Sequence, residues 1–100
     1  MSLKEYTAIS DEVRQKVYKR DSFDDWPCCV ICGSPYFIEV HHYVSRGRGG
    51  MGIPENLVCL CAYHHQKLHN GDREVKNFCR EYLEAIYPGW DESKVIYRKD

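Results

Sequence analysis

Two short segments decide the fold of this 100-residue chain: residues 39–42 read EVHH, and residues 61–69 read CAYHHQKLH. Together they hold all five histidines of the sequence. A pair of cysteines, Cys29 and Cys32, lies a little upstream. Cysteine and histidine are the preferred ligands of zinc and related metals. We therefore predict two metal sites folded around each other, one structural and one catalytic.

The predicted structural site uses two ligand pairs of equal spacing, each with two intervening residues: Cys29 with Cys32, and Cys61 with His64. Such pairs, joined by a longer loop, are typical of a tetrahedral Cys3His zinc site, because a tight turn brings both ligand atoms onto one ion. Cys28 is an alternative ligand to its neighbour Cys29, which the spacing favours. Buried free thiols are the competing explanation, and they suit Cys59 and Cys79.

The remaining histidines predict the catalytic site. His65 and His69 are four positions apart and share one helix face, whereas His64 is turned about 100° away and faces the zinc. His41 and His42 are neighbours on a strand, so their side chains point to opposite sides. We expect His41 to hold a divalent metal together with His65 and His69. His42 is then free to act as general base, because imidazole has an unperturbed pKa of about 6.5. This arrangement suits hydrolysis of a phosphodiester.

Around these segments the sequence predicts one domain over residues 1–100, with a core at about 10–70. The expected elements are a helix at 10–20, a turn-rich connector at 21–27, a strand at 36–40 that runs into 41–42, a glycine-rich loop at 44–54, a strand at 57–60, and helices at 62–69 and 72–87. Residues 1–9 read as a loose lead-in, and residues 95–97 as a candidate last strand.

Composition narrows the functional classes. A net charge of −1 is unfavourable for a nucleic-acid binder, so binding to DNA would have to use a local basic patch. Arg46 and Arg48, among glycines, and Lys67 are the expected phosphate contacts, and a solvated loop is the competing explanation. No apolar run approaches the ~18 residues of a membrane helix. We therefore expect a cytoplasmic protein, in which six cysteines indicate metal binding more than disulfides.

The order of these motifs resembles the HNH endonuclease family. The resemblance rests on EVHH at 39–42, Gly49-Gly50, Asn56-Leu57-Val58 and C-x-x-H-H-x-x-x-H at 61–69. It implies an α+β fold: a small, treble-clef-like ββα-metal domain (His-Me finger) with flanking N- and C-terminal helices. It also implies that His42 is the general base and His65 a metal ligand. His41 then occupies a ligand position that is often aspartate.

The resemblance assigns supporting residues as well. Asn56 would hold the loop between the strands through side-chain hydrogen bonds to the backbone. Glu39 would orient a histidine, and a solvent-facing strand residue is its competing explanation. The double histidine, with His65 and His69, is similar to the nuclease domains of colicins. Histidine at position 64 departs from the family, in which the fourth zinc ligand is often cysteine.

These features predict a metal-dependent DNA endonuclease with a structural Zn²⁺ and a catalytic Mg²⁺, Mn²⁺, Ni²⁺ or Zn²⁺. By resemblance, small chains of this kind come from bacteria and phages and act beside phage packaging proteins. The alternative is a non-catalytic zinc module that binds DNA or protein, which would have no need of His41, His42, His65 and His69. A thiol redox protein is disfavoured, because Cys29-x-x-Cys32 lacks a βαβ context.

Overall fold

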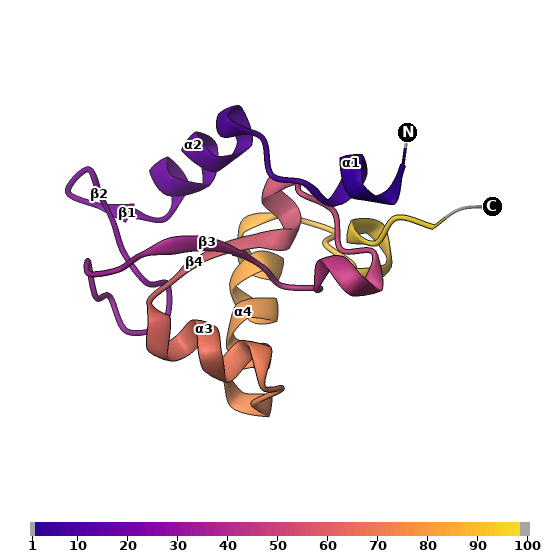
Figure 1. Cartoon of the computed structure of the whole chain (residues 1–100). Helices are drawn as coiled ribbons and strands as arrows, with labels where there is room; N and C mark the ends of the chain where they lie inside the picture. The colour runs from indigo at the N-terminus through magenta and orange to yellow at the C-terminus, as the bar shows by residue number, and fades with distance from the viewer. Residues whose placement is uncertain (1, 99–100) are drawn as a thin grey trace.

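A short antiparallel strand pair forms the centre of the computed structural model, which describes residues 2–98 (Figure 1). Strand β3 (Glu39–His42) pairs with β4 (Leu57–Leu60), so that His41 lies opposite Val58 and His42 opposite Leu57. Helix α3 (Ala62–His69) follows β4 after Cys61. This ββα order confirms the expected fold class.

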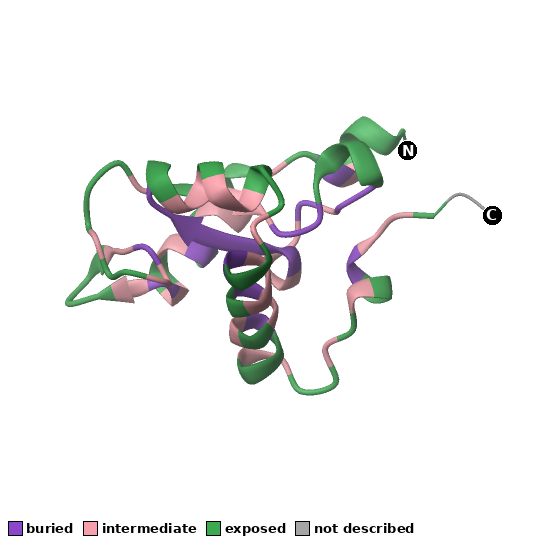
Figure 2. Cartoon of the chain, turned by 90° about the horizontal axis from the view of Figure 1, so that it is seen from below, coloured by how far each residue is buried: buried purple, intermediate pink, exposed green. Residues whose placement is uncertain are grey.

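Strand β4 is completely buried (Figure 2). Its residues belong to two apolar clusters. Successive strand residues face opposite sides. Leu57 and Cys59 accordingly pack with Val17 of helix α2 (Asp11–Arg20). Val58 and Leu60 pack in the other cluster, which contains the apolar face of helix α4 (Arg73–Ile86). Because every side chain of β4 is used in the core, its backbone is a rigid support for the neighbouring strand that carries His41 and His42.

The two longer helices begin at the residues that the sequence indicates. The side chain of Ser10 accepts a hydrogen bond from the backbone N–H of Val13, and Asp72 accepts one from Val75. Such caps satisfy donors that the first turn of a helix leaves free. No helix within residues 2–98 has the length and apolar character needed to cross a membrane.

Several expected boundaries are wrong. The presumed lead-in contains helix α1 (Leu3–Thr7), capped by Ser2 and Glu5. The connector contains a hairpin of β1 (Ser22–Phe23) and β2 (Trp26–Pro27). Strand β3 begins only at Glu39, because Phe37 adopts a left-handed backbone (φ 54°) that interrupts an extended strand.

The glycine-rich loop and the C-terminal segment are also more structured than expected. The loop contains the 3-10 turn η1 (Arg46–Arg48), and η2 (Pro54–Asn56) leads into β4. The candidate last strand is instead the turn η3 (Glu92–Val95), followed by a single antiparallel bridge between Ile96 and Gly50.

A buried ion pair ties the helices to β4. Arg20 donates two hydrogen bonds to Asp21, whose side chain is fully buried (2.7 and 2.9 Å). Asp21 also accepts hydrogen bonds from the backbone N–H of Cys59 and the hydroxyl of Tyr82. Arg20 donates further to the carbonyl of Leu57. Every partner of the carboxylate is a donor, so its burial is compensated.

Candidate active site

Four ligand atoms converge at the start of α3, all within 4.8 Å of one another: those of Cys29, Cys32, Cys61 and His64. The Cys61 Sγ–His64 Nδ1, Cys29 Sγ–His64 Nδ1 and Cys32 Sγ–Cys61 Sγ distances are 3.4, 3.6 and 3.9 Å. Tetrahedral zinc, with bonds of about 2.3 Å to sulfur and about 2.0 Å to nitrogen, places its ligands roughly 3.5–3.8 Å apart. The cluster therefore fits a zinc ion.

The structure also distinguishes the two neighbouring cysteines. The thiol of Cys28 points away from the cluster and donates to the carbonyl of Trp26. Cys29 is buried inside the cluster. Burial opposes ionisation of Cys29, but backbone hydrogen bonds from Cys32, Cys61 and Ile31 outweigh it and lower the pKa of its thiol. Cys29 is thus the better ligand, as the spacing indicates.

The histidines of helix α3 belong to two different sites. His64 faces the cysteines, whereas His65 and His69 face a pocket of about 440 Å³ on the other side. The ring of His41, from β3, stacks on that of His65 with centroids 3.5 Å apart and planes within 8°. The His65 and His69 centroids are 6.3 Å apart. The three imidazoles expected to bind a metal therefore lie in one pocket.

The ligand atoms of these three rings do not all lie within 4.8 Å of one another. Within residues 2–98, the Cys3His cluster is the one group of three or more such ligand atoms that gathers closely enough for a metal. The environment nevertheless favours the neutral form of two of these imidazoles, those of His41 and His65. Burial, with the nearby His65 and His42, lowers the pKa of His41 to about 4. Burial and His69 lower the pKa of His65, against the opposing effect of Glu39. Neutral imidazoles retain the lone pairs that metal binding needs.

His42 lines the same pocket. It is half-buried, and its Nε2 lies 2.7 Å from the carbonyl oxygen of Thr7 in α1. Burial lowers the pKa of His42, as does the positive charge of Arg46, while the hydrogen bond to Thr7 opposes them. The ring nitrogen Nδ1 is left without a partner among the described residues. His42 thus shares the pocket with the imidazoles on α3, and a backbone carbonyl from α1 holds its Nε2.

Asn56 organises the loop that joins the two strands. It is fully buried, and its side chain accepts from the N–H of Val44 and donates to the carbonyls of Val44 and Met51 (2.8, 3.1 and 2.9 Å). Gly50 lies against this side chain, and a Cβ there would meet the Val44 carbonyl at 1.7 Å. The hydrogen bonds expected of Asn56 are confirmed, and they fix the loop that carries Arg46 and Arg48.

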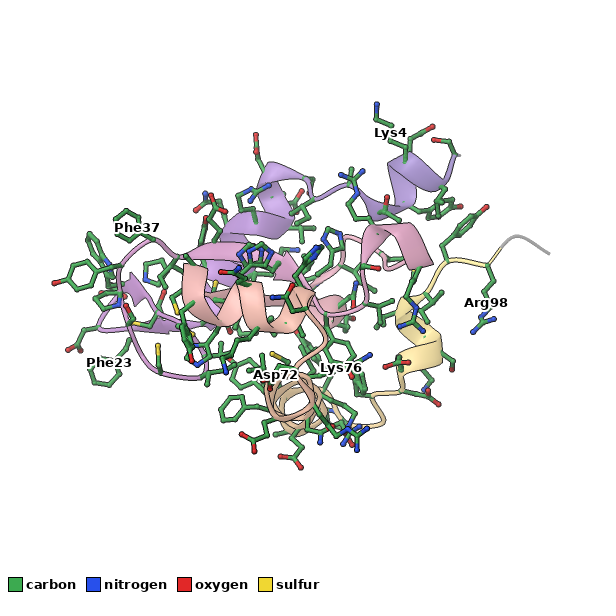
Figure 3. All side chains as sticks on the ribbon, turned by 60° about the horizontal axis from the view of Figure 1, so that its bottom comes forward. Lys4, Phe23, Phe37, Asp72, Lys76 and Arg98 are labelled. Atoms are coloured by element: carbon green, nitrogen blue, oxygen red, sulfur yellow. The ribbon has the colours of Figure 1, made fainter. Side chains whose placement is uncertain are left out.

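The basic side chains around the pocket differ from expectation in one respect. Arg46 and Arg48 line it, and so does Lys76 of α4. Lys67 does not: its ammonium lies 3.6 Å from Asp72 and over the ring of Tyr63. Asp72 and Lys76 lie near each other at the start of α4 (Figure 3). Sequence reasoning missed Lys76, because only the crossing of α4 over α3 brings it to the pocket.

Glu39 stands at the outer end of β3 and is exposed. No hydrogen bond joins it to a histidine among the described side chains, although its charge acts on His65. The geometry thus gives Glu39 an electrostatic influence on the pocket without a direct contact.

Comparison with known proteins agrees with this geometry. Residues 29–71 match the family model for HNH endonuclease. "Uncharacterized protein YdfU" of Escherichia coli K12 is 31% identical over an alignment of 71 residues, and the match covers 68% of this chain and 20% of that protein. "Type IV methyl-directed restriction enzyme EcoKMcrA" of the same organism is 32% identical over an alignment of 95 residues, and the match covers 79% of this chain and 32% of that protein. The chain thus spans a third or less of the length of either relative.

Proposed function

Because residues 29–71 belong to the HNH endonuclease family, we propose that this chain is a metal-dependent endonuclease that hydrolyses phosphodiester bonds in DNA. One observation carries the proposal: a single pocket gathers histidines from β3 and α3 with basic side chains from the loop and α4. The structural cluster lies on the opposite face of α3 and serves to fix that helix.

His41, His65 and His69 would hold the catalytic divalent metal. The stacking of His41 on His65 already brings two donor rings together, and a side-chain rotation would direct their nitrogens to one ion. Imidazole ligands suit Zn²⁺ and Ni²⁺ better than Mg²⁺, which prefers oxygen. When bound, such a metal supplies Lewis-acid stabilisation of the scissile phosphate.

His42 acts as general base in this proposal. As a water oxygen attacks the phosphorus atom, the water proton passes to Nδ1 of His42 and the bond from phosphorus to the leaving oxygen breaks. The Nε2–H of His42 stays bonded to the Thr7 carbonyl throughout, at the distance of 2.7 Å seen here. The ring therefore needs no new orientation during the step.

Arg46, Arg48 and Lys76 would hold the phosphates on either side of the cleaved bond. Their three positive charges line the pocket, whereas the whole chain carries −1. Guanidinium and ammonium contacts of this kind position a nucleic acid without reading its sequence. We therefore propose weak sequence preference for this chain by itself. A link to phage packaging proteins stays a prediction from resemblance, because the similar proteins reported above bear no such description.

A non-catalytic zinc module that binds DNA or protein is the competing function. It would need the Cys3His cluster but gives no reason for imidazoles from two elements to share a basic pocket. Plasmid cleavage by the zinc-loaded chain, with Mg²⁺, Mn²⁺, Ni²⁺ or further Zn²⁺, distinguishes the two. We expect nicked or linear DNA with at least one of these metals, and no cleavage in the presence of EDTA. A folded, DNA-binding chain that cuts with none of them would favour the module.

A further inference from the structure

The N-terminal helix α1 lies outside the matched segment 29–71 and contacts two residues that line the pocket, His42 and Arg46. Figure 1 shows α1 at the end of the molecule that also carries the η1 loop and the C-terminal segment, and the labelled Lys4 and Arg98 mark this end in Figure 3. Its last residue, Thr7, is 2% exposed. The Thr7 carbonyl lies 2.7 Å from Nε2 of His42, and the Thr7 hydroxyl accepts a hydrogen bond from Nε of Arg46 at 3.2 Å.

We propose that Thr7 is a positioning residue of this active site. Its main-chain carbonyl holds His42 in the tautomer with hydrogen on Nε2, and its hydroxyl holds Arg46 beside the same pocket. The catalytic meaning of these contacts rests on the proposed function, whereas the tautomer and the contacts do not.

The tautomer follows from the chemistry of the partner. A carbonyl oxygen can only accept a hydrogen bond, so Nε2 of His42 must carry the hydrogen. A neutral imidazole has one N–H, and Nδ1 is then the acceptor that remains. Once Nδ1 takes a proton, the Nε2–H donates to a carbonyl from a positively charged ring, which strengthens that hydrogen bond. A fixed carbonyl thus favours the protonated product without any rearrangement.

A close backbone contact keeps α1 in place. The N–H of Gly52 donates to the Tyr6 carbonyl at 3.0 Å. A Cβ at Gly52 would lie 2.0 Å from the carbonyl oxygen of Ala8 and 3.1 Å from that of Thr7. On the far side, the ring of Tyr6 stacks on Tyr97 with centroids 4.1 Å apart. The segment around Thr7 is therefore held between the active-site loop and the C-terminal segment, and Gly52 permits the approach.

The test uses Gly52→Ala in the full chain. The added methyl group must push the Ala8 and Thr7 carbonyls away from the loop and so loosen the contact with His42. The matched control is Gly47→Ala in the same loop, where an added Cβ meets nothing within 4 Å. The readouts are the ¹⁵N chemical shifts of the His42 ring, which distinguish the two tautomers, the zinc content, and kcat and KM for DNA cleavage. The His42 signals are assigned by their loss in His42→Gln.

We expect the Nε2–H tautomer in the wild type and in Gly47→Ala, and a mixture of tautomers in Gly52→Ala. Gly52→Ala should also lose about tenfold in kcat, a part of the ~10²–10⁴ that a general base contributes, with KM and zinc content near the wild type. Thr7→Val keeps the carbonyl and removes the hydroxyl. It should keep the tautomer and raise KM, because Arg46 loses its anchor.

Three results would overturn the proposal: an Nδ1–H tautomer in the wild type, a Gly52→Ala variant with wild-type tautomer and kcat, or a changed tautomer in Thr7→Val. Should Gly52→Ala fail to fold, the wild-type and Thr7→Val spectra decide. Should the wild type have the Nε2–H tautomer but cut no DNA with any metal, the proposed function fails while the placement of His42 by Thr7 stands.

Discussion

At the scale of single residues, Asn56 shows how one buried amide can fix a functional loop. Its three hydrogen bonds all go to backbone groups of residues 44 and 51. A glycine at position 50 lets the chain pass close over the amide. The loop in turn presents Arg46 and Arg48 to the pocket. Asn56 therefore acts on the pocket through the backbone that it holds.

Replacing Asn56 with alanine should cost about 2–4 kcal/mol in the free energy of unfolding, because buried backbone groups lose their partners. Urea denaturation measures this loss. Asn70→Ala, at the exposed end of α3, is the control and should stay within about 0.5 kcal/mol of the wild type. Equal stability of Asn56→Ala and Asn70→Ala would mean that the loop does not depend on the amide.

The adjacent cysteines give a sharp test of the structural site. Cys29→Ser should lose the bound zinc and melt at a lower temperature, because the cluster loses a thiolate. Cys28→Ser should keep its zinc and its melting temperature, since the Cys28 thiol lies outside the ligand group and donates to the Trp26 carbonyl. Elemental analysis and thermal melting measure the two properties. Zinc retained in Cys29→Ser but lost in Cys28→Ser would reverse the ligand assignment.

At the scale of elements, α3 was predictable and α1 was not. Residues 61–69 carry ligands whose spacing determines which helix face each occupies, so sequence alone separates His64 from His65 and His69. Helix α1 has five residues, too few to show an apolar period, and its position depends on contacts with His42, Arg46 and Gly52. Its one local signal is Ser2-x-x-Glu5, a capping box.

The hairpin β1–β2 and the late start of β3 were hidden for a related reason. Asp24, Asp25 and Phe37 adopt left-handed backbones without glycine. Aspartate adopts this conformation more readily than phenylalanine, but glycine or asparagine would have been the clearer signal at all three positions. The position of Lys76 in the pocket could not be predicted from the sequence either, because it depends on how α4 packs beside α3.

The junction of α2, β4 and α4 should depend on Arg20. Arg20→Ala leaves the buried carboxylate of Asp21 without its cation, which typically costs about 3–5 kcal/mol. Lys16→Ala on the same helix breaks only an exposed pair with Glu12 and should cost less than about 1 kcal/mol. Chemical denaturation of both variants measures these losses. Similar free energies of unfolding would show that the buried pair stabilises the fold no more than the exposed pair does.

At the scale of the whole molecule, the proposed function depends on a small positive region in a chain of net charge −1. Arg46, Arg48 and Lys76 line the pocket, while Phe23 and Phe37 lie exposed at the other end from Lys4 and Arg98 (Figure 3). A chain of this kind cannot neutralise many phosphates. DNA binding should therefore be weak and only modestly dependent on salt.

Three phosphate contacts predict a slope of about −3 in a plot of log K against log salt concentration. Arg48→Ala should reduce the slope by about one unit, whereas Lys19→Ala, on the exposed surface of α2, should leave it nearly unchanged. Fluorescence anisotropy with a short duplex gives these slopes. A wild-type slope near −10 would mean that the DNA-binding surface extends far beyond the pocket.

The central claim is that His42 serves catalysis as the general base, whereas His64 belongs to the structural zinc site. The most direct test is plasmid cleavage by His42→Ala, with zinc analysis and thermal melting of the same sample. The variant should lose at least about 10² in cleavage rate, because the general base is gone. Its zinc content and melting temperature should match the wild type, since His42 lies outside the Cys3His cluster. A variant that cuts at the wild-type rate would contradict the claim.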